Sequence, residues 1–318
     1  MKHQSSEIIP VFFAVDDRYA PFLGVALRSM LAHADPRCFY RIHVLTTGLT
    51  ADNQAKLRAE LAQNAAISFD DVSGAMARVC ASLPMRDYYS AATYYRVFIG
   101  SLFSQYDRAL YFDSDLVFCG DIARMYHTDL GGKLIGAVAD DVLAMQPVFG
   151  DYVEAVLGVP RTHYFNAGIL LLDLAKYRAM HMEERFLSLL TKRRFAVAQD
   201  QDYLNVLCQH DVHYFDSSWN LSAAPANRRR RAKILHYKMN WKPWHEDDVA
   251  FAEHFWRYAD ASAFADDIRA IKRGYRMVDR IRDQMAAERL VATAVAETET
   301  ARAQACQPIC STALAVQA

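Results

Sequence analysis

The sequence lacks an excess of charge of either sign, because 36 lysine and arginine residues are balanced by 37 aspartate and glutamate residues. A formal net charge of -1 provides no global field to attract nucleic acid or an anionic membrane, so we expect no nucleic-acid partner. The 53% of hydrophobic and 23% of charged residues are typical of a globular protein. A chain of 318 residues could hold about two domains.

Long hydrophobic runs are also missing. The run at residues 8–15 is only strand-sized, and the run at residues 167–172 is far shorter than the ~20 residues that a membrane span needs. The first seven residues, MKHQSSE, are polar and do not resemble a secretory signal. Six cysteines, at positions 38, 80, 119, 208, 306 and 310, form no CxxC pair, which predicts reduced and mostly buried thiols. These features predict a cytoplasmic protein.

Short apolar strands alternate with amphipathic helices as far as residue 236. Apolar runs predict strands at 9–15, 39–46, near 67, 109–112, 134–139, 168–173 and 233–236. Helical spacing predicts helices at 22–31, after a cap at Thr50, from Ser90, and at 183–191. This alternation predicts an α/β fold with a mostly parallel sheet and helices on both of its faces.

The composition changes near residue 263, which we take as the end of a main domain at 1–262. Residues 263–290 carry an apolar stripe at helical spacing and five basic side chains beside it, and predict a basic amphipathic helix. Three roles are open for it: packing on the main domain, packing on a second copy, or peripheral contact with the inner face of the membrane. Residues 291–318 are rich in Ala, Thr and Gln and predict a flexible tail.

The most informative segment is ALYFDSDLV at residues 109–117. A buried strand that runs into Asp113, Ser114 and Asp115 would place two carboxylates where an α/β sheet opens its ligand crevice. Two like charges this close are costly to bury unless a cation neutralises them. Mg²⁺ and Mn²⁺ both accept carboxylate ligands, and a diphosphate could complete the shell. The alternative is a pair of solvated turn aspartates.

A histidine and a lysine strengthen the hypothesis of a metal site. His236 follows a short apolar strand and could supply a nitrogen ligand, which suits Mn²⁺ better than Mg²⁺. Lys242, six residues later, could neutralise a phosphate. Either residue, taken alone, could equally lie at the surface or at the edge of the core.

Six segments together carry a family resemblance. They are FAVDDRY from Phe13, TYYRVFI from Thr93, YFDSD from Tyr111, YFNAGILLLDL from Tyr164, QDQDYLN from Gln199 and HYKMNWKPWH from His236. In this order and spacing, the chain resembles the family 8 retaining glycosyltransferases, a group that includes bacterial lipopolysaccharide galactosyl- and glucosyltransferases and glycogenin. The resemblance covers residues 8 to 250 and implies a GT-A type nucleotide-binding fold.

The resemblance also implies roles for the matching residues around the nucleotide and the metal. Asp16 would hydrogen-bond the uracil, and Arg96 would contact the donor. Asp113, Asp115 and His236 would bind the metal, with Asp113 also reaching the ribose or the sugar. Without the resemblance, Asp16 could simply end a strand.

Further roles concern the sugar and the diphosphate. Asn166, Asp200 and Gln201 would line the donor sugar, Lys242 would hold the diphosphate, and Ser114 is expected in the donor site. The alternatives are a turn residue at Asn166 and a helix cap at Asp200.

Two departures from the family pattern concern the nucleotide. Arg18 stands where bacterial members often have Asn, and Met239 stands where a small residue, usually Gly, is familiar. A Cβ at residue 239 would obstruct a backbone that must approach the phosphates closely.

The predicted function is therefore retaining transfer of a hexose from UDP-glucose or UDP-galactose to a saccharide acceptor, such as lipopolysaccharide or another surface glycan. Mn²⁺ is the expected cofactor, with Mg²⁺ as the alternative. One route uses a protein nucleophile, for which Asp200 and Gln201 are the candidates. The favoured route is attack on the same face as the leaving group, in which the departing phosphate deprotonates the acceptor and Lys242 stabilises the leaving group.

Other functions remain open from the sequence. Residues 113–117 also fit the D-x-D-x-[TV] pattern of phosphatases with an aspartyl nucleophile, for which Asp140 and Asp141 could supply metal ligands. That family places its motif on the first strand, whereas more than a hundred residues precede it here. A non-catalytic UDP-sugar-binding protein is the other alternative. Trp241, Trp244, Phe251, Phe255, Trp256 and Tyr258 could bind a sugar or form core, and Arg228–Arg231 could bind phosphates or face solvent.

Overall fold

The computed structural model describes residues 7–77 and 91–305. A central sheet of seven strands has the order β3-β2-β1-β4-β7-β6-β8. Four of its strand pairs are parallel, and the two pairs that involve β7 are antiparallel. In this order the strands are Ala65–Asp71, Cys38–Thr46, Glu7–Ala14, Arg108–Phe112, Phe165–Asp173, Ile135–Ala139 and Val212–Tyr214. The prediction of an α/β fold with a mostly parallel sheet is confirmed.

The order of the strands creates a crevice between β1 and β4. From β1 the chain first adds β2 and β3 on one side and then places β4 on the other side of β1. In open α/β sheets, ligands bind at the carboxyl ends of the strands at such a switch point. Asp16 lies two residues beyond the end of β1, and Asp113 directly follows β4.

A small second sheet brings the predicted histidine to the same place. It consists of β5 (Leu116–Phe118), β10 (Ile234–His236) and β9 (Leu221–Ser222). β10 is antiparallel to β5, with His236 opposite Leu116. The backbone N–H of Tyr237 donates to the carbonyl of Asp115 at 3.0 Å. The register of this sheet therefore fixes His236 beside Asp115.

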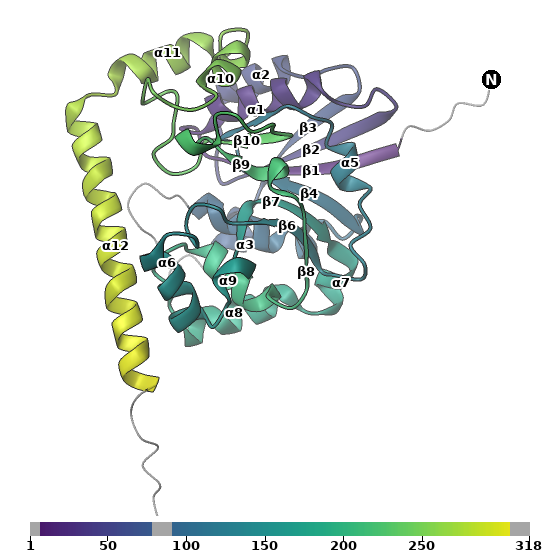
Figure 1. Ribbon diagram of the computed structural model, residues 1–318. Coiled ribbons are helices and arrows are strands. Elements are labelled where there is room, and N and C mark those ends of the chain that lie inside the picture. Colours follow the sequence, from purple (N-terminus) through teal and green to yellow (C-terminus); the bar gives the residue numbers. More distant parts are fainter. Residues whose placement is uncertain (1–6, 78–90, 306–318) are drawn as a thin grey trace, which may run out of the picture.

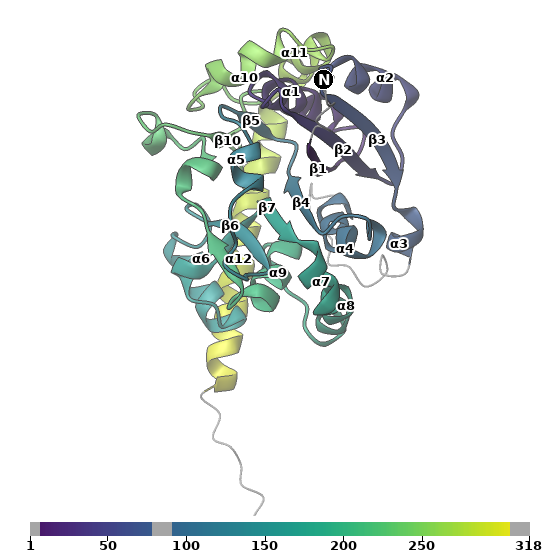
Figure 2. The ribbon, with the colours of Figure 1, turned by 90° about the vertical axis from the view of Figure 1, so that its right-hand side faces the viewer.

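Helices cover both faces of the central sheet (Figures 1 and 2). The alternation of side chains along β1 separates two hydrophobic cores, since Val11 and Phe13 belong to one and Phe12 to the other. Helices that pack into the first core are α1 (Ala20–Ala32), α2 (Ala51–Ala59), α10 (Ala252–Ala259) and α11 (Ala265–Gly274). Helices that pack into the second are α6 (Pro147–Tyr152), α7 (Leu174–Ala179), α8 (Met182–Lys192) and α9 (Asp200–Cys208).

Shorter helices complete the fold: α3 (Ser73–Ala77), α4 (Ile99–Leu102) and α5 (Ala123–Tyr126). The helix predicted from Ser90 is a 3₁₀ helix at Ala91–Phe98 that continues into α4, and Ser90 itself lies outside the described residues. Thr50 caps α2 as predicted, because its side chain accepts a hydrogen bond from the Asn53 N–H.

The C-terminal segment differs from the prediction. A single helix was expected at 263–290 and a flexible tail at 291–318, but α11 is followed by a separate helix, α12, at Met277–Ala305. The tail prediction is wrong for residues 291–305 because alanine is the best helix former and this stretch also buries side chains. Residues 306–318 lie outside the described residues.

Helix α12 runs along one side of the molecule and packs on α6 and on a π-helical turn at Val153–Leu157 (Figure 1). Its buried side chains share one face: Ala286, Leu290, Ala294 and Thr298. Arg302 near its end forms an ion pair with Asp151 of α6 at 3.0 Å. Of the three roles open for the C-terminal helix, packing on the main domain is therefore present in the structure.

Among the described residues, no helix is both long and apolar enough to span a membrane. Cys38, Cys119 and Cys208 are free thiols, and the first and last of these are buried, as predicted. Cys80, Cys306 and Cys310 lie outside the described residues.

Candidate active site

A cleft at the carboxyl ends of β1 and β4 is lined by all ten residues that the sequence predicted for the site. They are Asp16, Arg96, Asp113, Ser114, Asp115, Asn166, Asp200, Gln201, His236 and Lys242. These residues come from segments separated by more than two hundred positions. The fold therefore brings the predicted set together in one place.

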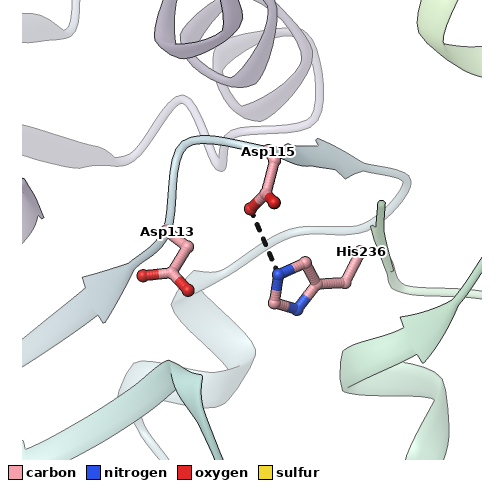
Figure 3. A group of neighbouring side chains, drawn as sticks. All are labelled: Asp113, Asp115 and His236. Atoms are coloured by element: carbon pink, nitrogen blue, oxygen red, sulfur yellow. Dashed lines mark ion pairs between the residues drawn. The ribbon is translucent and has the colours of Figure 1, made fainter. Parts of the chain in front are cut away.

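The three predicted metal ligands face one another across this cleft (Figure 3). One ligand atom each from Asp113, Asp115 and His236 lies within 4.8 Å of the others. The Nε2 atom of His236 is 3.1 Å from Oδ1 of Asp115, and the histidine is only 3% exposed. Two carboxylate oxygens and an imidazole nitrogen are donors that Mn²⁺ accepts, so the residues fit the expected ion.

Gly168 leaves the space that this arrangement needs. A Cβ at Gly168 would lie 2.5 Å from Oδ2 of Asp113 and 2.6 Å from Cε1 of His236. Its backbone carbonyl also accepts a hydrogen bond from the Asp113 N–H at 2.8 Å. Only glycine allows β7 to approach both ligands this closely, and no pattern in the sequence indicated this role for Gly168.

Lys242 and His236 stabilise the negative charge of Asp115. Burial opposes ionisation, but Lys242 and His236 hold the pKa of Asp115 well below its ordinary value. Lys242 forms an ion pair with this carboxylate, and its side chain lies beside the ring of Trp244. The carboxylate that was predicted to bind a metal is therefore an anion in the folded protein.

Arg96 connects Asp113 with Asp200. Its guanidinium lies 3.1 Å from Oδ1 of Asp113 and 2.9 Å from Oδ2 of Asp200, and it stacks over the ring of Tyr111. Despite the cost of burial, these two aspartates raise the pKa of Arg96 above its ordinary value. The hydroxyl of Tyr111 donates to Oδ1 of Asp113 at 3.0 Å. Arg96 therefore lines the cleft and also holds both carboxylates in place.

Asp200 is the first residue of α9 rather than its cap, since the cap position belongs to Gln199, which has a φ of 47°. Burial raises the pKa of Asp200 to about 7, although Arg96 opposes this shift. Among the described residues, no donor is directed at its buried Oδ2, because Arg96 approaches off the hydrogen-bonding direction. The helix-cap interpretation of Asp200 is wrong.

The neighbouring side chains form a buried polar network. Oε1 of Gln201 accepts from the Ala167 N–H at 3.0 Å and from Nδ2 of Asn166 at 3.1 Å. Asn166 also donates to Oδ2 of Asp140 at 3.2 Å. Two backbone N–H groups, of Val142 and Leu143, hold the other oxygen of Asp140. Burial opposes ionisation of Asp140, but Lys238 and these N–H groups hold its pKa below the ordinary value.

Lys238 and Asp140 also line the cleft, but neither was predicted as a residue of the glycosyltransferase site. Lys238 is buried, with its Nζ 3.0 Å from Asp141 and 3.9 Å from Asp140. Asp140 was predicted only as a metal ligand of the phosphatase alternative, and in the structure it faces the amides of Asn166 and Gln201. No periodicity or motif in the sequence indicated that these groups meet.

The two departures from the family pattern have structural consequences. The guanidinium of Arg18 is exposed and binds Oδ2 of Asp16 at 2.9 Å. Met239 has a φ of 54°, a left-handed conformation that costs a residue with a Cβ about 1–2 kcal/mol. Its side chain lines the cleft and packs on the second core. The methionine therefore keeps a backbone conformation that suits glycine.

Apolar side chains line the cleft next to the network. Val142 and Leu143 directly follow the Asp140–Asp141 pair, and Leu290 reaches the cleft from α12. The aromatic residues after His236 contribute chiefly to packing: Trp244 stacks on Phe22 with 4.0 Å between ring centroids, and Phe255 is 1% exposed. The Arg228–Arg231 run is largely exposed, with Arg228 paired to Asp248.

Comparison with known proteins agrees with this geometry. The sequence profile described as "Glycosyl transferase family 8" matches residues 10–248. The lipopolysaccharide 1,2-glucosyltransferase of Escherichia coli K12 is 27% identical over 289 residues, which cover 83% of this chain and 81% of that protein. The lipopolysaccharide 1,3-galactosyltransferase of Salmonella typhimurium LT2 is 24% identical over 262 residues, covering 77% and 75% respectively.

Solved structures show the same similarity. The galactosyltransferase LgtC, in a complex with donor and acceptor sugar analogs, matches with a TM-score of 0.67 and 29% identity. The match covers 80% of this chain and 96% of LgtC. The WbbM bifunctional glycosyltransferase matches with a TM-score of 0.73 and 24% identity, and this chain spans 53% of its length. The fold is of the GT-A type, and the chain belongs to glycosyl transferase family 8.

Proposed function

We propose that the protein transfers a hexose from a UDP-sugar, either UDP-glucose or UDP-galactose, to a saccharide acceptor with retention of configuration and with Mn²⁺ as cofactor. The observation that carries the proposal is the convergence of Asp113, Asp115 and His236 with Lys242 at the switch point of the sheet. The relatives that act on lipopolysaccharide support lipopolysaccharide or another surface glycan as the acceptor.

The donor would lie along the cleft from Asp16 to Asp140. The uracil belongs near Asp16 at the end of β1, and the diphosphate beside Lys242 and the ligands of the metal. A bound Mn²⁺ would supply electrostatic stabilisation of the charge on the departing diphosphate. The sugar would then face the amides of Asn166 and Gln201, next to the carboxylate of Asp140.

The geometry favours same-face attack over a protein nucleophile. The Asp200 carboxylate lies against the Arg96 guanidinium, and the Gln201 side chain is held by three hydrogen bonds to Asn166, Ala167 and Asp140. A group engaged in this way would have to break its contacts before it could attack the anomeric carbon. In the proposed route the phosphate oxygen that leaves the sugar takes the proton of the acceptor hydroxyl. Trapping a glycosyl ester on Asp200 would overturn this route.

The donor and metal can be tested without knowledge of the acceptor. We expect slow, Mn²⁺-dependent hydrolysis of one UDP-hexose in a panel that includes UDP-glucose and UDP-galactose, measured by release of UDP. Addition of EDTA should abolish the release, and excess Mn²⁺ should restore it. If calorimetry shows UDP-sugar binding but no panel member is hydrolysed or transferred, the protein is instead a UDP-sugar-binding protein. Unchanged activity in EDTA would show that the enzyme does not need a metal ion.

The exposed side of α12 motivates a second proposal, peripheral contact with a membrane. Met277, Val278, Ile281 and Met285 are each more than half exposed on α12. Several basic residues nearby are paired with acidic ones, as in Arg269–Asp260 and Arg280–Glu246, which weakens the case for purely electrostatic attraction. Sedimentation with anionic vesicles tests the proposal: the double variant Ile281→Glu with Met285→Glu should lose binding. Equal sedimentation of variant and wild type would remove the membrane contact.

A further inference from the structure

A buried chain of hydrogen bonds joins the network around Asn166 to the histidine of the metal site. Its central member is Asn220, which is 2% exposed and was not singled out in the sequence. Nδ2 of Asn220 donates to Oδ1 of Asn166 at 2.8 Å, and Oδ1 of Asn220 lies 3.0 Å from Nδ1 of His236. Asn220 precedes β9, the strand that pairs with β10 and thus lies next to His236.

The orientation of Asn166 within this chain is determined by its neighbours. The backbone N–H of Gly168 can only donate a hydrogen bond, and it points at Oδ1 of Asn166 from 3.1 Å. The carboxylate of Asp140 can only accept, and it faces Nδ2 of Asn166. A flipped Asn166 amide would place oxygen against oxygen and N–H against N–H. Its carbonyl oxygen is therefore the atom that faces Asn220.

The orientation of Asn166 determines the next two groups. Because Asn220 must present its NH₂ to Oδ1 of Asn166, its own carbonyl oxygen faces His236. That oxygen can only accept, so Nδ1 of His236 must carry the hydrogen. In a neutral imidazole the other nitrogen, Nε2, then has a free lone pair. Nε2 points toward Asp115, on the side where the three predicted ligands meet (Figure 3).

We propose that Asn220 is a positioning residue that holds the His236 ring with its hydrogen on Nδ1 and thereby presents Nε2 to a divalent cation. The proposal rests on the proposed function, because that function supplies the cation. A hydrogen-bond acceptor behind a metal-bound histidine fixes the tautomer and the direction of the ring. Since the same chain continues through Asn166 to Gln201 and Asp140, Asn220 also links the metal site to the groups expected around the sugar.

Two substitutions distinguish the hydrogen bond of Asn220 to His236 from its hydrogen bond to Asn166. Asn220→Ala removes the acceptor for His236 and the donor for Asn166. Asn220→Asp keeps an acceptor for the Nδ1–H of His236, but it places a carboxylate oxygen against Oδ1 of Asn166. We therefore expect the alanine variant to lose metal affinity. The aspartate variant should keep that affinity and raise the KM for the donor.

The experiment is measurement of the Mn²⁺ dissociation constant by electron paramagnetic resonance, which needs no catalytic turnover. Asn220→Ala should weaken Mn²⁺ binding roughly 10- to 100-fold. A matched control is Asn227→Ala, because Asn227 is also buried, at 9% exposure, and its amide donates to the carbonyl and hydroxyl of Ser222 at 3.0 and 2.8 Å. The control should bind Mn²⁺ like the wild type. Thermal unfolding establishes that each variant is folded.

Any other result of these Mn²⁺-binding measurements would overturn the proposal. Unchanged Mn²⁺ affinity in Asn220→Ala, or an equal loss in Asn227→Ala, would show that Asn220 serves packing alone. If Asn220→Ala does not fold, Asn220→Asp decides, and a loss of affinity there as large as in Asp115→Asn would contradict the proposal. If the wild-type protein binds no Mn²⁺, the metal part of the proposed function fails and this inference fails with it.

Discussion

The two ends of the cleft are built in different ways. At the polar end, which holds the three predicted metal ligands, charged side chains at strand ends are held by other polar groups, as Asp113 is by Arg96 and Tyr111. At the opposite end, which we call the apolar end, the lining side chains are Val142, Leu143 and, from α12, Leu290. At the polar end, hydrogen bonds and ion pairs hold each side chain in one orientation. The apolar end depends on how a distant helix packs, so it can change without disturbing the polar end.

We expect substitutions at the polar end of the cleft to reduce activity most, and Asp115→Asn to have the largest effect of all. The amide would weaken metal binding and leave Lys242 without its anionic partner. Loss of electrostatic stabilisation in an active site lowers kcat by roughly 10²- to 10³-fold, and we expect at least this loss in UDP-sugar hydrolysis. Circular dichroism and thermal unfolding should show an intact fold. Wild-type turnover by this variant would refute the role of the carboxylate pair.

Gly168→Ala should produce the second largest effect. The new methyl group would meet Asp113 and His236 at 2.5 and 2.6 Å, so the ligands must move apart. We expect Mn²⁺ affinity to fall roughly 10- to 100-fold, with a loss of stability of about 1–3 kcal/mol from overpacking. Gly274→Ala is the matched control because no atom lies within 4 Å of its added Cβ. Equal Mn²⁺ binding by both variants would show that the site tolerates rearrangement.

Much of the polar end was predicted because its residues lie in the six segments that carry the family resemblance, and each of these segments is continuous in the sequence. The strand pattern by itself pointed to a crevice at Asp113 and Asp115, with a pair of solvated turn aspartates as the alternative. Asn220, Gly168 and Lys238 could not be predicted in the same way. Their roles arise from contacts between β7, β9 and the segment after β10, and such contacts depend on the register of strands that are distant in the sequence.

The apolar end was the part that sequence reasoning described least well. The Ala-rich composition after residue 290 predicted a flexible tail, whereas residues 291–305 continue α12 and bury Ala294 and Thr298. Flexible and helical stretches of this composition differ mainly in whether a neighbour buries one helix face. The neighbour here is α6, more than a hundred residues away in the chain. The position of Leu290 at the cleft followed from that packing.

Leu290→Ala should weaken binding of the acceptor and leave binding of the donor unchanged. Because Leu290 lines the apolar end of the cleft, we expect the acceptor to bind against it. A hydrophobic contact of this size is worth about 1–3 kcal/mol of discrimination, or roughly 10- to 200-fold in the specificity constant. We expect a higher KM for the acceptor and unchanged hydrolysis of the UDP-sugar.

Val291→Ala is the control for this substitution because Val291 is 39% exposed on the same helix. The two variants should be compared well below their unfolding temperatures, since a Leu→Ala change in a core costs about 2–5 kcal/mol. A parallel loss of donor hydrolysis and transfer in Leu290→Ala would indicate a purely structural role for Leu290.

Asp200→Asn should change the stability of the protein with a distinctive pH dependence. Because burial raises the pKa of Asp200 to about 7 in the folded protein, its carboxyl group favours folding in the protonated form. This contribution is fully present below the unfolded pKa of about 3.9 and is lost as the pH rises through 7.

The asparagine variant has no such titration. Its melting temperature should therefore rise relative to the wild type between pH 4 and pH 8, as measured by calorimetry in metal-free buffer. A constant difference across this range would show that Asp200 does not titrate there.

The proposed function requires that the carboxylate pair after β4 binds a divalent cation, which in turn binds the diphosphate of the donor. Isothermal titration of UDP with and without Mn²⁺, and of Mn²⁺ with and without UDP, tests it directly. We expect each ligand to tighten the binding of the other by the same factor, as thermodynamic linkage requires, and Asp115→Asn to abolish this coupling. UDP affinity that is identical in Mn²⁺ and in EDTA would contradict the account.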